Sequence, residues 1–274
     1  MTVHIHSLFL IACIKGVVYL INLHGFMRRY RAIFSFFGTV LLVALIFWAV
    51  NSPRIVGASA TQRQLPVYSV QANEKVLSIS FDAAWGNEDT QTLIDILQAH
   101  NIKSTFFVVG DWVDKYPESV RELAEAGNEV MSHSSHHDHF SQLSTEQIQA
   151  DLTECNEKIA AITGVTPSLF RCPYGEYDDH VITAVRSLNM EPIQWSVDSL
   201  DWKGLSAAEI TQRVLQKVKP GSIVLFHNAA EHTPEALPVI LDSLQKDGYS
   251  IVPVSALLLQ GDTFIDNTGM QCPK

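Results

Sequence analysis

The chain has 274 residues and a formal net charge of −10 when histidine is counted as neutral. Nucleic-acid binding needs clustered Lys and Arg, so this acidic balance excludes a general nucleic-acid binder. The four cysteines form no CxxC pair, which argues against both a disulfide framework and a thiolate zinc site. Beyond an apolar N-terminal segment, roughly 220 residues remain, enough for one α/β barrel domain.

The N-terminal region predicts a membrane anchor. Ala32 to Val50 contains no charged residue over 19 positions, close to the ~20 that a bilayer-spanning helix needs. Three arginines stand immediately before this stretch: Arg28, Arg29 and Arg31. The positive-inside rule keeps that end in the cytoplasm. We therefore predict a cytoplasmic segment over 1–31, a single-pass transmembrane signal anchor over 32–50, and an extracytoplasmic domain at the cell membrane.

Three alternatives remain open for this region. The small-residue stretch Ala58 to Ala60 resembles a signal-peptidase site, although it lies far from the apolar run. Met27 is an alternative start, because the sequence that follows it opens like an export signal. Leu8 to Leu23 is a second apolar run, interrupted by Lys15, and offers a second membrane span.

The rest of the chain predicts one α/β domain over residues 75–262, preceded by a linker over 51–74 and followed by a C-terminal tail over 263–274. Short apolar runs alternate there with helix-length amphipathic segments. The predicted strands are Val76–Phe81, Ser104–Val109, Glu129–Ser132, Leu169–Phe170, Ile193–Val197, Ile223–Phe226 and Tyr249–Val252. The predicted helices are Glu88–His100, Pro117–Ala126, Thr145–Thr163, Asp178–Leu188, Ala207–Val218 and Pro234–Lys246.

This alternation predicts a parallel sheet with helical crossovers. About seven strands favour a distorted (β/α) barrel, and an open doubly wound sheet is the alternative. No GxGxxG or GxxxxGK[ST] motif follows a predicted strand, so we expect no nucleotide cofactor. Two helix starts carry capping boxes, Ser144 with Gln147 and Ser206 with Glu209.

Polar residues follow several predicted strands at their C-terminal ends, where barrel enzymes build active sites. Asp82 ends a buried apolar strand, a costly position for a carboxylate unless it is paired or functional. His133 and His137 stand at i and i+4, which on a helical turn would place both imidazoles on one face for a metal. A solvated polar loop is the alternative interpretation of this pair.

Further polar residues come after the later strands. Arg171 follows one strand, and its guanidinium could hold a carboxylate in the ionised state. The turn around Tyr174 exposes a backbone N–H toward the same end of the sheet. Asp201 could pair with His227 and raise the pKa of its imidazole. Trp202 is interpreted either as a core residue or as a stacking surface for a sugar ring.

Five sequence blocks together resemble the NodB-homology polysaccharide deacetylases, also called carbohydrate esterase family 4. The blocks are SFDAAWG at 80–86, HSSHH at 133–137, RCPYG at 171–175, DSLDW at 198–202 and LFH at 225–227. The resemblance covers roughly Val76 to Leu259. Pro66 to Val70, together with the segment SFDAAWGNEDT, resembles most closely the sporulation-associated PdaB-like group of this family.

The resemblance implies a distorted (β/α) barrel and a set of proton-transfer residues. Asp82 matches the base that activates water, and Arg171 matches the residue that holds this base. His227 matches the acid that protonates the departing amine, and Asp201 matches its partner.

The resemblance also implies residues that bind metal and substrate. His133 and His137 match two ligands of a divalent metal, for which zinc is the candidate. Tyr174 matches the residue whose backbone N–H helps to bind the oxyanion, and Trp202 and Leu225 match residues that line the acetyl pocket.

One departure from the family pattern concerns the metal. Active members carry a second aspartate directly after the base, and here that position is Ala83, which has no ligand atom. Three interpretations follow: a metal held by the two histidines together with waters or substrate, a rearranged ligand such as Asp82 or Asp138, or a weak or inactive saccharide-binding relative. A milder departure is Cys172, where the family usually has proline.

We therefore expect hydrolysis of N-acetyl groups from N-acetylhexosamine residues of a cell-wall polysaccharide, with peptidoglycan as the substrate and sporulation as the setting. The alternative is a catalytically weak or inactive glycan-binding or structural protein of the cell wall. The expected partners are the glycan and, through the N-terminal helix, the membrane. Neither nucleic acid nor a nucleotide is expected.

Overall fold

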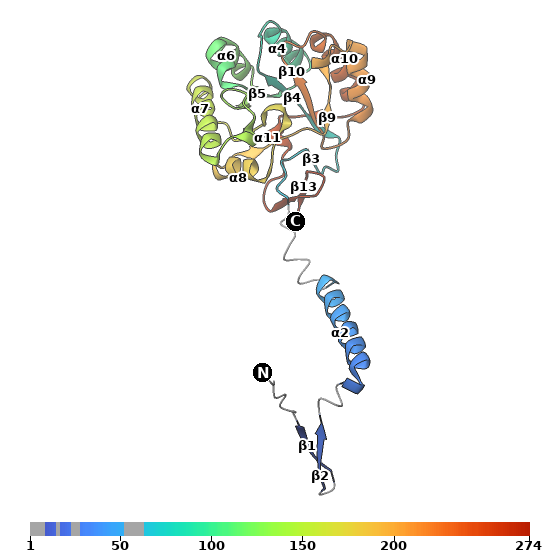
Figure 1. Cartoon of the computed structure of the whole chain (residues 1–274). Helices are drawn as coiled ribbons and strands as arrows, with labels where there is room; N and C mark the ends of the chain where they lie inside the picture. The colour runs from blue at the N-terminus through green and yellow to red at the C-terminus, as the bar shows by residue number, and fades with distance from the viewer. Residues whose placement is uncertain (1–8, 15–16, 23–27, 52–62) are drawn as a thin grey trace. The chain divides into compact units, whose positions relative to one another are not determined.

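The computed structural model describes residues 9–14, 17–22, 28–51 and 63–274 (Figure 1). The chain divides into two compact units, Met1–Gln62 and Arg63–Lys274. The predicted alternatives at Met27 and at 58–60, and the linker from 52 to 62, lie outside the described residues.

In the first unit, β1 (Phe9–Ile14) and β2 (Val17–Asn22) pair antiparallel, and α2 spans Arg31–Asn51. Within the second apolar run, the described residues 9–14 and 17–22 therefore form strands and not a second membrane-spanning helix. Among the described residues, no helix is both long and apolar enough to cross a membrane. The transmembrane anchor predicted over 32–50 is therefore helical but not supported as a span.

The second unit is built on a parallel sheet, in whose interior β4 (Val76–Ala83) lies between β5 and β10. The strand order is β8-β7-β6-β5-β4-β10-β9, and β11 pairs with the start of β4. The other strands are β5 (Thr105–Val108), β6 (Glu129–Ser132), β7 (Leu169–Phe170), β8 (Glu191–Pro192), β9 (Val197–Asp198), β10 (Ile223–His227) and β11 (Ser250–Ile251). The α/β class and the parallel sheet predicted from the sequence are confirmed.

The sheet curls because its two edges are neighbours in the sequence. β8 ends at Pro192 and β9 begins at Val197, at opposite ends of the strand path. Five residue steps reach at most about 18 Å, so the edges must approach each other. The result is a curled half-barrel, which supports the predicted distorted barrel over an open flat sheet. The single strand predicted over Ile193–Val197 is wrong, because one continuous strand cannot lie at both edges.

Helices surround the strands of the second unit (Figure 1). They are α4 (Thr90–Ala99), α5 (Gly110–Lys115), α6 (Pro117–Glu125), α7 (Thr145–Thr163), α8 (Asp179–Ser187), α9 (Ala207–Lys217), α10 (Thr233–Lys246) and α11 (Val254–Leu257), with short 3-10 turns η1 (Phe140–Gln142), η2 (Pro173–Gly175) and η3 (Asp201–Lys203). Each predicted helix is present. Both predicted capping boxes are formed, at the starts of α7 and α9.

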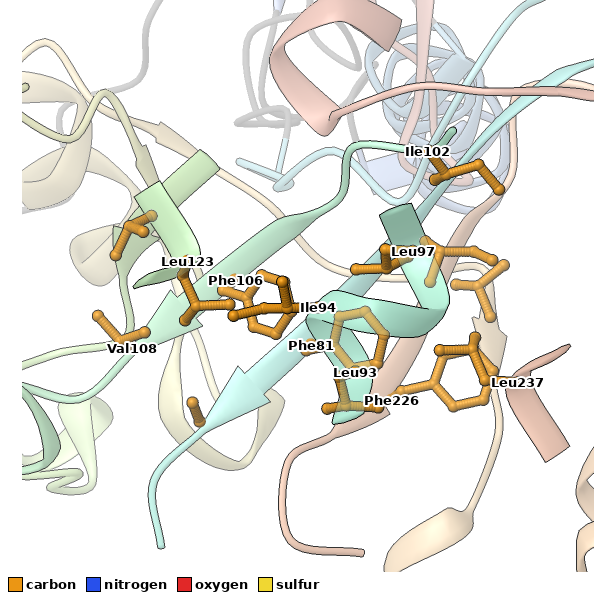
Figure 2. Close-up of a cluster of buried hydrophobic side chains, with 14 of the residues drawn as sticks. Phe81, Leu93, Ile94, Leu97, Ile102, Phe106, Val108, Leu123, Phe226 and Leu237 are labelled. Atoms are coloured by element: carbon orange, nitrogen blue, oxygen red, sulfur yellow. The ribbon is translucent and has the colours of Figure 1, made fainter. Parts of the chain in front are cut away.

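Side chains of β4 alternate between the two faces of the sheet, and this alternation determines which of them face the site. Leu77, Ile79, Phe81 and Ala83 belong to one apolar cluster, which also includes residues of α4 and β5 (Figure 2). The rings of Phe81 and Phe106 stack with centroids 4.7 Å apart. Because successive side chains of a strand point to opposite faces, Asp82 is directed to the concave face of the half-barrel.

Residues 63–74 of the predicted linker, and the predicted tail over 263–274, belong to the second unit. β3 (Ser69–Val70), β12 (Thr263–Ile265) and β13 (Met270–Pro273) form a three-stranded sheet. Val67 and Val70 are buried, and Val67 bridges to Ile193 beside the gap between the sheet edges. These strands are too short to show a periodic pattern, which is why the sequence did not indicate them.

The close packing of β3 against Gly221 can be tested by substitution. Its φ is +79°, and a Cβ added there would lie 1.7 Å from the carbonyl oxygen of Val70. Gly248 has a similar φ of +82° but no heavy atom within 4 Å of such a Cβ. We expect Gly248→Ala to lose about 1 kcal/mol of unfolding free energy from left-handed strain alone, and Gly221→Ala about 3 kcal/mol or more. Urea denaturation measures both, and equal losses would contradict the close packing of β3.

Candidate active site

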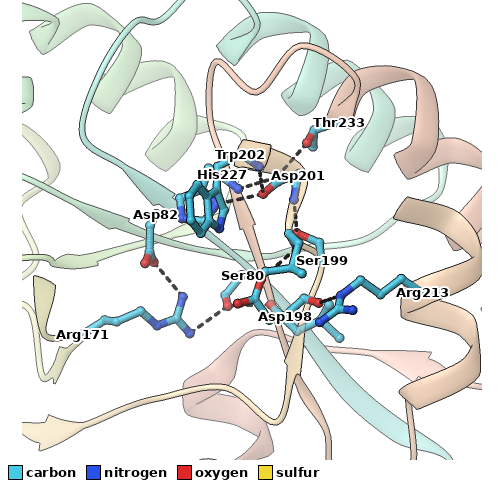
Figure 3. Close-up of polar contacts among 12 residues, drawn as sticks. Ser80, Asp82, Arg171, Asp198, Ser199, Asp201, Trp202, Arg213, His227 and Thr233 are labelled. Atoms are coloured by element: carbon cyan, nitrogen blue, oxygen red, sulfur yellow. Dashed lines mark hydrogen bonds and ion pairs between the residues drawn. The ribbon is translucent and has the colours of Figure 1, made fainter. Parts of the chain in front are cut away.

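A buried ion pair lies at the C-terminal end of β4. Asp82 is 5% exposed and Arg171 is fully buried. The Nη1 of Arg171 donates to Oδ1 of Asp82 at 2.7 Å, and its Nη2 donates to the Ser80 hydroxyl at 2.9 Å (Figure 3). The Nη2 also reaches the Gln194 carbonyl at 3.3 Å. These contacts fix the carboxylate of Asp82 in one position.

The charge state of Asp82 follows from two opposing effects. Burial disfavours the carboxylate, but the positive charge of Arg171, aided by nearby histidines, outweighs burial and lowers the pKa of Asp82. Asp82 is therefore ionised at neutral pH, as a general base must be.

A second pair lies at the end of β10, next to β4. The Cα of His227 is the register partner of Asp82. The Nδ1 of His227 is 2.8 Å from Oδ1 of Asp201. The Oδ2 of Asp201 accepts hydrogen bonds from the His227 backbone N–H at 2.8 Å and from the Thr233 hydroxyl at 2.7 Å. With Nδ1 engaged, the imidazole has Nε2 available for another partner.

The environment of His227 favours its charged form. Burial lowers the pKa of its imidazole, but the hydrogen bond and the negative charge of Asp201 outweigh burial and raise it overall. The predicted Asp201–His227 pair is thus formed, with the expected direction of the pKa.

The two candidate metal ligands are brought together, but not on a helical turn. His133 and His137 lie in a loop, and His137 has a φ of +59°. The helical geometry assumed from their i, i+4 spacing is therefore wrong, because a left-handed residue interrupts the turn. Their rings still approach, with centroids 5.0 Å apart. His133 Nδ1 contacts the Arg171 carbonyl at 2.7 Å, and its Nε2 is 3.6 Å from Oδ2 of Asp82.

The residues present do not fit a three-ligand metal site. Ala83, at the position of the expected third ligand, offers only a methyl group and belongs to the apolar cluster around Phe81. Within the described part of the chain, no group of three or more His, Cys, Asp or Glu residues could hold a metal ion. The structure therefore gives no geometric support to the predicted divalent metal.

The two pairs open on one cavity of about 430 Å³. It is lined by Asp82, Trp85, His133, His137, Tyr174, Gly175, Trp195, Asp198, Trp202, Leu225 and His227. All predicted site residues except Arg171 and Asp201 thus line the cavity, and these two hold residues that do. Tyr174, predicted to present its backbone N–H, has a left-handed φ of +58°.

Sequence reasoning did not single out Trp85, Trp195 or Asp198 as site residues. Trp85 and Asp198 lie within the blocks that carry the resemblance, and Trp195 stands three residues before Asp198. Their proximity in the sequence to the predicted site residues could have indicated that they belong to the site.

Comparisons with known proteins agree with this geometry. A family model described as polysaccharide deacetylase matches residues 69–193. A peptidoglycan-N-acetylglucosamine deacetylase of Bacillus cereus is 32% identical over 196 residues, covering 70% of this chain and 92% of that protein. YlxY of Bacillus subtilis is 31% identical over 193 residues, covering 70% of this chain but only 60% of its own length.

Solved structures match over the same region. BA3943, a CE4 family pseudoenzyme from Bacillus anthracis, aligns with a TM-score of 0.68 and 33% identity, covering 70% of this chain and 68% of that one. A BA3943 mutant with restored enzymatic activity aligns equally well, at 34% identity and 70% coverage of each chain. The matched family model, the relative that is 32% identical and covered to 92%, and the curled half-barrel lead to one conclusion: the chain belongs to the polysaccharide deacetylase family, carbohydrate esterase family 4.

Proposed function

We propose that this chain hydrolyses N-acetyl groups on N-acetylhexosamine residues of a cell-wall glycan, with peptidoglycan as the substrate. One observation carries the proposal. Asp82 and His227 stand at paired positions on adjacent strands, each held by a charged partner, and both line the same cavity. A base and an acid in these positions match the two proton transfers that amide hydrolysis needs. The names of the relatives support the choice of peptidoglycan.

The proposed reaction assigns one role to each group. The Asp82 carboxylate accepts a proton from a water molecule, whose oxygen attacks the acetyl carbonyl carbon. The Tyr174 backbone N–H donates a hydrogen bond to the oxyanion that forms. His227 then gives the proton on its Nε2 to the amide nitrogen as the C–N bond breaks. Acetate and the free amine of the sugar are the products.

Ala83 favours a second candidate function, glycan binding without turnover. The family is typically metal-dependent, and a metal would stabilise the oxyanion, but the third ligand is missing here. The similarity to the pseudoenzyme BA3943 supports the same alternative.

The cellular setting is part of the proposal. A cell-wall substrate places the domain outside the cytoplasm, as the N-terminal sequence also predicts. A role in sporulation is supported by the resemblance of SFDAAWGNEDT to the sporulation-associated group.

Acetate release from N-acetylated peptidoglycan tests the proposal. We expect release by the purified chain to exceed that of an Asp82→Asn, His227→Ala double variant by about 100-fold or more, because both proton transfers are lost. Glycan binding is measured in parallel on both proteins. If both proteins release equal acetate but still bind glycan, glycan binding without turnover replaces hydrolysis as the function. If the unmodified chain neither releases acetate nor binds glycan, both candidate functions are contradicted.

The protonation of His227 provides a second test. Replacing Asp201 by Asn removes the charge that favours the imidazolium, so the pKa of His227 should fall, and the alkaline limb of activity should move to lower pH. NMR titration of the His227 ring measures the shift. Asp198→Asn is the matched control, because the Asp198 charge contributes least of the named causes. A shift as large in the control would contradict the role of Asp201.

Metal content tests the incomplete ligand set. We expect the chain, purified without chelator, to carry far less than one zinc per molecule, because two imidazoles replace the usual three protein ligands. Elemental analysis measures the content. Near-stoichiometric zinc that disappears in His133→Ala would show that another group supplies the missing ligand.

A further inference from the structure

Three large aromatic side chains are exposed around the cavity. Trp85 is 47% exposed, Trp202 53% and Tyr174 58%, and all three line the cavity. In the described part of the second unit, the other exposed large hydrophobic residues are Val165, Val239 and Phe264. Exposed apolar side chains gathered at one cavity indicate a binding surface rather than chance exposure. The family resemblance implies roles for Tyr174 and Trp202, but none for Trp85.

The loop that carries Trp85 is held rigidly. The buried side-chain amide of Asn228 donates to the Trp85 carbonyl at 2.8 Å and to the Gly86 carbonyl at 2.7 Å. The indole N–H of Trp112 donates to the same Gly86 carbonyl at 2.5 Å. Gly86 has a φ of +57°, and a Cβ there would lie 2.7 Å from the Cβ of Ala229. These contacts join the loop after β4 to the loop after β10, so Trp85 is positioned by buried groups although its ring is exposed.

The indole of Trp85 lies beside the proposed acid. Its ring and the imidazole of His227 are nearly parallel, at 18°, with centroids 5.7 Å apart. Parallel rings in direct face contact would be closer, so this distance describes an offset stack that leaves part of the indole uncovered. A substrate nitrogen that receives a proton from His227 must come within about 3 Å of its Nε2. The sugar ring that bears this nitrogen is then next to the uncovered indole.

We propose that Trp85 is the sugar-stacking platform of the site and receives the apolar C–H face of the hexosamine ring whose amide nitrogen faces His227. The inference rests on the proposed function and names a substrate contact within it. The negative face of an indole attracts the weakly positive C–H groups of a pyranose. Because the backbone that carries Trp85 is already held by buried donors, binding need not order this loop, and that part of the entropy cost is avoided.

Calorimetric titration of the full chain with the tetrasaccharide of N-acetylglucosamine tests the proposal. We expect Trp85→Ala to weaken binding about tenfold, a typical effect of losing one stacked aromatic ring. Trp85→Phe should stay within about threefold of the unmodified chain, because a smaller aromatic face remains. Phe264→Ala is the matched control: Phe264 is 44% exposed on β12 and does not line the cavity. Its affinity should be unchanged.

A second measurement does not depend on the stability of Trp85→Ala. In the NMR spectrum of the unmodified chain, the indole N–H signal of Trp85 is assigned by its absence in Trp85→Phe. We expect it to shift on addition of the tetrasaccharide, while the signal of the buried Trp112 stays in place.

Failure of the Trp85 platform and failure of the proposed function give different results. If the unmodified chain binds the tetrasaccharide but Trp85→Ala binds equally well, or the Trp85 signal does not shift, the platform is overturned and the proposed function stands. If the unmodified chain binds neither the tetrasaccharide nor peptidoglycan fragments, the proposed function fails and the platform fails with it.

Discussion

The buried ion pair between Asp82 and Arg171 is the interaction on which the candidate site depends. It crosses the concave face of the half-barrel from β4, in the interior of the sheet, to the residue after β7. β6 and β7 share only one register pair, Ser132 with Phe170, so backbone pairing holds this edge weakly. The bonds from Arg171 to Asp82, Ser80 and Gln194 therefore help to join this side of the sheet to β4 while they fix the base.

Two buried carboxylates divide the chemistry of the site. Asp82 has a cationic partner that keeps it ionised and in place, whereas Asp201 is itself the partner that orients His227 and favours its imidazolium. Both arrangements are complete without a metal ion. Among the described residues, no third metal ligand accompanies the two histidines, and the methyl group of Ala83 at that position is the reason for considering glycan binding without turnover as the second candidate function.

Much of this arrangement could be predicted because parallel strands bring their C-terminal ends together. Asp82 and His227 meet for that reason, and the capping boxes at Ser144 and Ser206 needed only local sequence. The split between β8 and β9 could not be predicted, because Ile193 to Val197 alternates apolar and polar residues like a single strand, although it connects the two edges of the sheet. β3 and β13 pair with each other although they lie at the two ends of the second unit's sequence. A local sequence pattern cannot predict pairing between such distant segments.

A double-mutant cycle on Asp82 and Arg171 tests the central claim most directly. Arg171→Met leaves a buried carboxylate without its cation, which should cost about 3–5 kcal/mol of unfolding free energy. Adding Asp82→Asn removes the charge that was left unpaired, so the double variant should be more stable than Arg171→Met alone. Denaturation of the four proteins gives the coupling energy. Losses that simply add would contradict a site built on this ion pair.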